Sequence, residues 1–190
     1  MINPETHIRT NQTAMHPEIS INLHNDGYIL TFAGLAVKAA VGHQGVTSSS
    51  NKCEGDGKTP SGCWPLRRVY YRPDRITLPD IALNATAITP SLGWCDDPEH
   101  DQYNQIVTLP FDGRHETLWR DDHAYDVVIP LGYNDDPPIA GRGSAIFFHL
   151  LHPGRHNTEG CVAIAHNDMM ALLPLLTEKT VMRIADKATG

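Results

Sequence analysis

The stretch FFHLLHPGRHNTEGCVAI, residues 147–164, carries an apolar run at each end and polar residues between them. Short apolar runs bounded by turn-forming residues are typical of buried strands, so we expect strands over residues 144–150 and 161–165. The stretch also holds three histidines, a glutamate and a cysteine. These side chains could form a metal site, a nucleophile with its base, or a polar loop beside an isolated thiol.

Most of the remaining apolar segments are equally short, and several alternate with polar residues as strands do. We expect strands over 19–24, 65–71, 104–110, 126–132 and 180–185, and two strands within 28–42, interrupted near Gly34. A hairpin turn at 24–27 joins the first of these to the next. Strands at this spacing predict a mainly β fold, a sandwich or barrel. Segments rich in Gly, Pro and Asp predict long loops at 53–65, 88–105 and 132–143.

One segment, residues 167–179, has the apolar periodicity of a helix. Asn167 or Asp168 is suited to cap its start, and Pro174 should kink it or end it early. Its Met and Leu residues are interpreted as part of the core. The fold should therefore contain one or two short helices.

Length and charge narrow the possible partners. A chain of 190 residues is expected to form one domain, here residues 19–190 after an N-terminal extension, residues 1–18. The net charge is −7 and no block of five like charges occurs, so we expect no nucleic-acid partner. No apolar run is long enough for a transmembrane segment. The N-terminus lacks the features of a secretory signal, and the oligomeric state is left open.

The four cysteines are Cys53, Cys63, Cys95 and Cys161. None forms a CxxC pair, which argues against a zinc ribbon or a thioredoxin-type motif. Cys53 and Cys63 bracket a Gly-rich loop and could be bridged, but spacing alone cannot establish a disulfide. Each cysteine could also be a small buried apolar residue.

A metal site would use His149, His152 and His156, because three imidazoles can hold zinc. His149 ends an expected strand, whereas the other two histidines lie in a loop with Pro153 and Gly154. No helix holds the three on one face, so we expect no metal.

A nucleophilic site would use Cys161 with His149. Gly160 lets the backbone approach a substrate carbonyl, so that main-chain N–H groups can stabilise an oxyanion. If the two strands pair, His149 is brought back toward Cys161. An imidazole within reach can take the thiol proton and generate a reactive thiolate at neutral pH.

Two motifs together resemble the L,D-transpeptidase (YkuD-like) catalytic domain. In that family a histidine at a strand end precedes a Ser/Thr-His-Gly-Cys tetrad, and the matching positions here are His149 and residues 158–161, TEGC. The segment GDGKTPSGCWPL (55–66) is similar to the family's early G-x-x-x-TP-x-G segment. The resemblance spans roughly residues 20 to 186.

The resemblance implies an L,D-transpeptidase-like catalytic domain that acts on peptidoglycan stem peptides without a cofactor. Cys161 would form a thioester with the donor peptide, His149 would be the base, and Gly160 and Cys161 would supply oxyanion donors. The substrate-binding candidates, which contact the substrate or hold the loop, are Thr158, Arg142, Arg155, His156 and Tyr133. Trp119 is interpreted as core rather than as part of the cleft.

Two departures from the family pattern bear on the substrate. Glu159 replaces the usual histidine, and Ala163 replaces the usual Arg or Asn. They resemble a compact Glu-Gly-Cys branch, some of whose members form 1,3 rather than 3,3 links, so the donor bond is left open. Hydrolysis of stem peptides, as by an L,D-carboxypeptidase or endopeptidase, and non-catalytic wall binding are the alternatives. A periplasmic location is inferred from the substrate alone.

Overall fold

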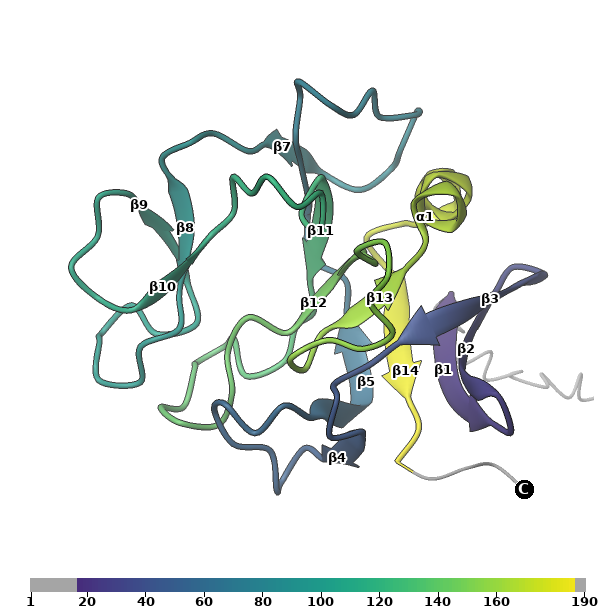
Figure 1. Cartoon of the computed structure of the whole chain (residues 1–190), viewed down its shortest axis with the longest axis horizontal. Coiled ribbons are helices and arrows are strands. Elements are labelled where there is room, and N and C mark those ends of the chain that lie inside the picture. Colours follow the sequence, from purple (N-terminus) through teal and green to yellow (C-terminus); the bar gives the residue numbers. More distant parts are fainter. Residues whose placement is uncertain (1–16, 187–190) are drawn as a thin grey trace, which may run out of the picture.

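The computed structural model describes residues 17–186 (Figure 1). They form strands β1–β14, helix α1 (His166–Leu172) and the 3-10 turn η1 (Leu173–Leu175). The strands are β1 (Glu18–His24), β2 (Gly27–Phe32), β3 (Leu35–Ala40), β4 (Val46–Ser48), β5 (Thr59–Pro65), β6 (Val69–Tyr71), β7 (Ala85–Ala87), β8 (Leu92–Cys95), β9 (Ile106–Thr108), β10 (His115–Thr117), β11 (Val127–Pro130), β12 (Phe147–Leu150), β13 (Val162–Ile164) and β14 (Val181–Ile184). The predicted extension, residues 1–18, lies outside the described residues except for Pro17 and Glu18.

Eleven of these strands form one mixed sheet, in the order β4-β5-β14-β1-β2-β3-β13-β12-β11-β6-β7. The other three form a small sheet, β10-β8-β9, which lies to one side of β11 and β12 in Figure 1. Strands β12 and β13 pair in parallel, as do β1 and β14. The prediction of a mainly β fold with sandwich architecture is confirmed.

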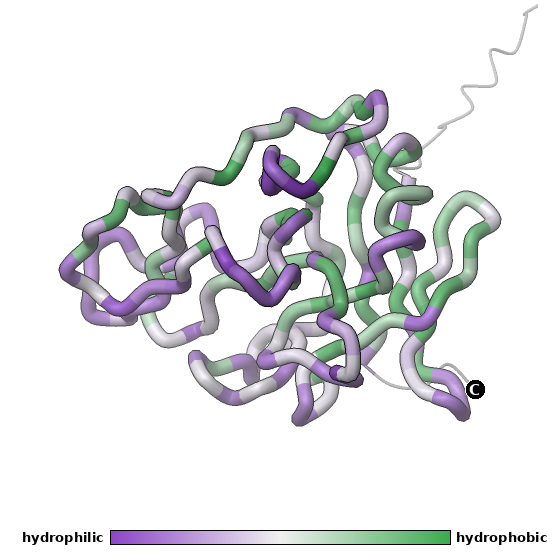
Figure 2. Tube along the Cα trace, turned by 45° about the horizontal axis from the view of Figure 1, so that its top comes forward, coloured by the Kyte–Doolittle hydropathy of each residue, from purple (hydrophilic) through white to green (hydrophobic). Residues whose placement is uncertain are grey.

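Two clusters of buried side chains hold the sheets and the helix together. The larger cluster joins β1 and β14 to α1, with Ile19, Met169 and Met182 fully buried. The smaller cluster lies under the small sheet. Strand β12 serves both, because successive side chains point to opposite faces: Phe148 belongs to the larger cluster and Phe147 to the smaller. Hydrophobic residues follow the strands and α1, whereas many of the loops and turns are hydrophilic (Figure 2).

The predicted strands are present, although most are shorter than expected. The segment 28–42 contains two strands, and the turn between them holds Ala33 and Gly34 at positive φ. Within 65–71, Pro65 ends β5 and only Val69–Tyr71 form the expected new strand.

The sequence missed five strands, β4, β5, β7, β8 and β10, and two of these lie in predicted loops. Strand β5 fills the second half of the loop predicted at 53–65, and β8 lies in the loop predicted at 88–105. Both strands contain or follow glycine and proline, so a search for apolar runs did not detect them. Gly62 adopts φ +143 within β5, where tertiary pairing with β14 compensates for its poor strand propensity.

The helix begins and ends earlier than predicted. Its N-cap is Ala165, which makes no side-chain capping bond, so the prediction that Asn167 or Asp168 caps the helix is wrong. The α-helical turns stop at Leu172, and Pro174 lies in the 3-10 turn that follows. The expected effect of Pro174 is confirmed, since its ring cannot continue an α-helix. None of the helices within residues 17–186 has the length and apolarity needed to cross a membrane.

The burial of α1 predicts a large stability loss for Leu172→Ala. Leu172 is 1% exposed, and removing a buried Leu side chain costs about 2–5 kcal/mol through lost transfer free energy and the cavity left behind. Leu175→Ala is the matched control, because Leu175 is 43% exposed and should change the free energy of unfolding by less than about 0.5 kcal/mol. Urea denaturation measures both, and equal losses would contradict the assigned packing.

Candidate active site

Parallel pairing of β12 with β13 brings His149 and Cys161 to the same face of the sheet. The register sets Phe148 opposite Val162 and His149 opposite Ala163. Cys161, just before β13, is therefore level with Phe147 and two positions from His149, a diagonal separation of about 7–8 Å between backbones. Ala163 lies directly opposite His149. The strand pairing expected from the sequence is confirmed.

Gly160 shapes the turn that enters the Cys161 position. Its φ is +139, a conformation that residues with a Cβ rarely adopt. A Cβ built at this position would lie 3.0 Å from the carbonyl oxygen of Lys58. Both the backbone conformation and the close approach of a neighbouring chain therefore require glycine before the cysteine.

Two threonine hydroxyls hold this turn in place. Thr59 is fully buried, accepts the N–H of Gly42 at 2.8 Å and donates to the carbonyl oxygen of Gly160 at 2.8 Å. Thr158 donates to the carbonyl oxygen of Cys161 at 2.7 Å and accepts the N–H of Gly160 at 3.1 Å. Thr59 lies in the 55–66 motif, but its hydrogen bond to the carbonyl oxygen of Gly160 was not predicted from the sequence. Thr158 holds the turn, as one of its predicted roles required.

The thiol of Cys161 is buried and protonated. It donates to the carbonyl oxygen of Ala145 at 3.2 Å and accepts the N–H of Phe147 at 3.4 Å. Burial, followed by the nearby Glu116 carboxylate, raises the pKa of this thiol to about 12. The N–H of Phe147 and the cations of Lys52 and Arg120 act in the opposite direction but do not outweigh burial.

His149 is equally buried and uncharged. Burial lowers the pKa of its imidazole to about 4. Its Nδ1 lies 2.8 Å from the carbonyl oxygen of Leu150, a geometry in which Nδ1 carries the proton and donates it. The lone pair is then on Nε2, which is the atom able to accept a proton. The ring packs edge-on against Tyr125, with 5.3 Å between ring centroids.

At neutral pH the resting pair therefore has a neutral imidazole and a protonated thiol. Generation of a thiolate by His149 stays a prediction. Because the apolar surroundings penalise both charged forms, the resting pair is neutral. Proton transfer from Cys161 to His149 must then accompany attack on a substrate.

Cys161 and His149 line one cavity of about 550 Å³. Thr158, Gly160 and Arg155 also contribute to its wall. Its charged residues have both signs, the acidic ones being Glu54, Asp96, Glu116, Asp122 and Glu159 and the basic ones Lys52, Arg114, Arg120 and Arg155. The cavity therefore combines a reactive side-chain pair with groups that can bind a charged peptide.

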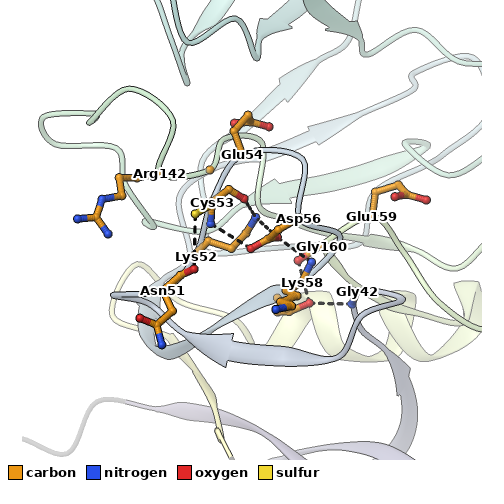
Figure 3. Close-up of polar contacts among 12 residues, drawn as sticks. Gly42, Asn51, Lys52, Cys53, Glu54, Asp56, Lys58, Arg142, Glu159 and Gly160 are labelled. Carbon is orange, nitrogen blue, oxygen red and sulfur yellow. Dashed lines mark hydrogen bonds and ion pairs between the residues drawn. The ribbon is translucent and has the colours of Figure 1, made fainter.

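Lys52 is a buried cation in this wall. Its ammonium donates to the carbonyl oxygen of Cys53 and to Asp56, both at 2.7 Å (Figure 3). Burial opposes ionisation of Asp56, but the N–H groups of Cys53 and Lys58 and the ammonium of Lys52 hold the pKa of Asp56 below its usual value. Gly143 packs over the Lys52 side chain, where an added Cβ would lie 3.2 Å from it. Lys52 and Asp56 thus form a buried ion pair in the wall of the cavity.

Three predicted substrate-binding residues are not in this cavity wall. The exposed Arg142 donates to the carbonyl oxygen of Ser50 at 2.6 Å and points away from Lys52 and Asp56 in Figure 3. The hydroxyl of Tyr133 donates to the carbonyl oxygen of Arg142 at 2.6 Å. His156 lines a different, smaller cavity beside β3. Their roles in binding substrate stay predictions.

The metal and disulfide alternatives gain no support from the geometry. Within residues 17–186, His, Cys, Asp and Glu side chains form no group of three or more that could hold a metal ion. His156 is exposed and His152 half-buried, whereas His149 is buried with its Nδ1 at a main-chain carbonyl. All four cysteines are free, so Cys53 and Cys63 are not bridged.

The sequence missed the cavity residues contributed by the small sheet and by the segment before β11. Glu116, on β10, accepts a hydrogen bond from the hydroxyl of Tyr125 at 2.5 Å. Trp119, interpreted as core, stacks on Arg72 with its ring centroid 3.6 Å from the guanidinium carbon. A strand of three residues carries too little periodicity to be detected, so Glu116 had no signal in the sequence.

The backbone constraint at Gly160 predicts that Gly160→Ala destabilises the protein by at least about 2 kcal/mol more than Gly141→Ala. Both positions have positive φ, for which alanine costs about 1–2 kcal/mol. Gly141 has open space around it, whereas at Gly160 the added carbon would meet Lys58 and disturb the bond from Thr59. Urea denaturation of the two variants checks this difference, and equal losses would show that φ alone accounts for the glycine.

The lowered pKa of His149 predicts an acid-dependent loss of stability. An unfolded histidine titrates near pH 6.5 and the folded one near pH 4, so the unfolded state binds more protons between these values. Stability should fall as pH decreases from 6.5 to 4, by roughly 3 kcal/mol from this group. In His149→Gln that part of the slope should be absent, while His24→Gln, an exposed control, should keep it. Parallel pH profiles for wild type and His149→Gln would contradict the assignment.

Comparison with known proteins gives the family. A search of curated proteins finds no match to the chain. The family model described as YkuD, L,D-transpeptidase catalytic domain, matches residues 7–184. These residues include both strands of the candidate site, the turn between them, and Thr59 and Thr158, which hold that turn. Because the match covers most of the chain, the protein belongs to the L,D-transpeptidase catalytic domain family.

Proposed function

We propose that this protein is a peptidoglycan L,D-transpeptidase that cross-links stem peptides through a thioester on Cys161. The observation that carries the proposal is the arrangement of a buried thiol and a neutral imidazole in one cavity, on a turn fixed by Thr59 and Thr158. Family membership supports a peptidoglycan substrate. Action on the cell wall further leads us to propose a periplasmic location.

The first half-reaction uses the neutral resting pair. As the Cys161 sulfur attacks the donor carbonyl carbon, its proton passes to Nε2 of His149. The carbon–nitrogen bond of the donor then breaks, and His149 returns the proton to the leaving amine. A thioester on Cys161 remains, and His149 is again neutral. The bond from Nδ1 to the carbonyl oxygen of Leu150 holds the imidazole in the tautomer that this transfer needs.

The tetrahedral intermediate needs donors for its oxyanion. The N–H of Gly160 is engaged by the hydroxyl of Thr158 at 3.1 Å, so it serves the turn in the resting protein. The N–H of Cys161 is the main-chain donor that we assign to the oxyanion. The buried ammonium of Lys52 lines the same cavity but is ion-paired with Asp56 at 2.7 Å, so we assign no oxyanion contact to it.

In the second half-reaction, the amine of another stem peptide attacks the thioester and releases Cys161. Water in place of the amine would make the protein a carboxypeptidase or endopeptidase. The type of cross-link depends on which residue of the donor stem forms the thioester. The first residue would give a 1,3 link and the third residue a 3,3 link.

Cys161→Ala should abolish cross-linking. The variant lacks the sulfur that forms the thioester, so purified wall material treated with it should yield no new muropeptide dimers by tandem mass spectrometry. Cys63→Ala, which removes an exposed thiol, should retain activity. The same spectra identify 1,3 or 3,3 dimers, whereas cleaved monomers alone would indicate hydrolysis. Dimers formed by Cys161→Ala, or the absence of any acyl adduct on the wild-type protein, would refute the proposal.

A further inference from the structure

The small sheet contributes one carboxylate to the reaction cavity that the mechanism above does not use. Glu116 is the middle residue of β10 and pairs with Trp94 of β8. It lines the same cavity as Cys161 and His149. Trp94 packs edge-on against Phe147, whose N–H contacts the Cys161 sulfur, so this sheet is anchored next to the nucleophile.

One oxygen of Glu116 is held and the other faces open space. Oε2 accepts the hydroxyl proton of Tyr125 at 2.5 Å. No other side chain within residues 17–186 bonds to Oε1 of Glu116. Among the same residues, no buried side-chain oxygen or nitrogen lacks a hydrogen-bond partner. Oε1 is therefore accessible, and the accessible space beside it is the cavity.

Two of the neighbouring cations are already paired with other carboxylates. Arg120 makes a two-pronged ion pair with Asp122. Arg114 bonds to Asp96. Neither guanidinium forms an ion pair with Glu116, so its carboxylate is left available to a cation that enters the cavity from outside.

The second half-reaction supplies such a cation. A primary amine acceptor is an ammonium at neutral pH, since alkylamines titrate near pH 10, and it must lose a proton before it can attack a thioester. His149 is poorly suited to this first deprotonation, because burial lowers the pKa of its imidazole to about 4. A carboxylate both attracts an ammonium and can accept a proton from it.

We propose that Glu116 is a catalytic residue that binds the ammonium group of the acceptor and removes its first proton. This inference rests on the proposed function, because it concerns the second step of that reaction. In this proposal, the small sheet carries the residue that favours a cationic amine over water as the acceptor.

Oε1 of Glu116 takes one proton from the ammonium, and the neutral nitrogen attacks the thioester carbonyl carbon. The carbon–sulfur bond breaks as the carbon–nitrogen bond forms. The second proton of the nitrogen passes through His149 to the departing sulfur of Cys161. Glu116 then releases its proton to solvent, and the protein is restored.

The surroundings of Glu116 suit a base stronger than an exposed carboxylate. Burial raises the pKa of Glu116, and the charges of Asp96, just after β8, and of Glu54, in the segment before β5, act in the same direction. The hydroxyl of Tyr125 and the charge of Arg120 act against them. The net effect favours proton uptake by Glu116 when an ammonium arrives.

Glu116→Gln tests the proposal, because the amide keeps the shape of the side chain but cannot take the proton. Cys161 is first acylated with a donor peptide or a carbapenem, and intact-mass spectrometry measures the thioester. Decay of the thioester is then followed with a primary amine, with hydroxylamine, which is uncharged at neutral pH, and with water. Glu99→Gln, an exposed carboxylate near the same sheet, is the matched control, and Glu116→Asp tests rescue by a carboxylate.

Glu116→Gln should still form the thioester, because Cys161 and His149 are intact, and its thioester should react with hydroxylamine as fast as that of wild type. Its transfer to the primary amine at pH 7 should fall by about 100-fold, the usual contribution of a general base. The loss of amine transfer should become smaller as the pH rises toward the pKa of the amine, because more of the amine is then uncharged. Glu116→Asp should recover part of the lost transfer rate. Normal amine transfer in Glu116→Gln would overturn this inference alone. A wild-type protein that never forms a thioester would overturn the proposed function and the inference with it.

Discussion

The hydroxyl of Thr59 is the contact on which the site depends. It is fully buried and joins three chain segments that are far apart in sequence, through the N–H of Gly42 and the carbonyl of Gly160. An unpaired buried backbone group costs about 1–3 kcal/mol, so loss of this hydroxyl would leave two such groups without a partner. The turn before Cys161 is thus held by β5 as much as by its own strand.

The site lies where the two buried clusters meet. Strand β12 contributes Phe148 to one and Phe147 to the other, and Cys161 belongs to the second. The nucleophile is therefore packed like a core residue on one side and open to a charged cavity on the other. Because dense packing allows little movement, the thiol and the imidazole keep their relative positions without a direct hydrogen bond in the resting protein.

Features encoded within short stretches could be predicted from the sequence. The apolar runs around His149 and Cys161 indicated two strands, and the glycine before the cysteine indicated a tight turn. The predicted helix cap was wrong because the helix begins after Ala165, whose main chain adopts the extended conformation of an N-cap without a side-chain hydrogen bond. The roles of Thr59 and Glu116 depend on contacts between distant segments: 101 residues separate Thr59 from Gly160. No local periodicity reports such a contact, and strands of three residues fall below what a pattern can resolve.

The protonated state of the resting Cys161 thiol also affects how fast this cysteine is oxidised under non-reducing conditions. Peroxides and disulfides react with thiolates, so a cysteine whose charged form is suppressed by burial is oxidised slowly to sulfenic and higher acids. The exposed Cys53 and Cys63 lack this shielding and would react first. Burial of Cys161 would thus protect the proposed nucleophile from oxidation in the resting protein.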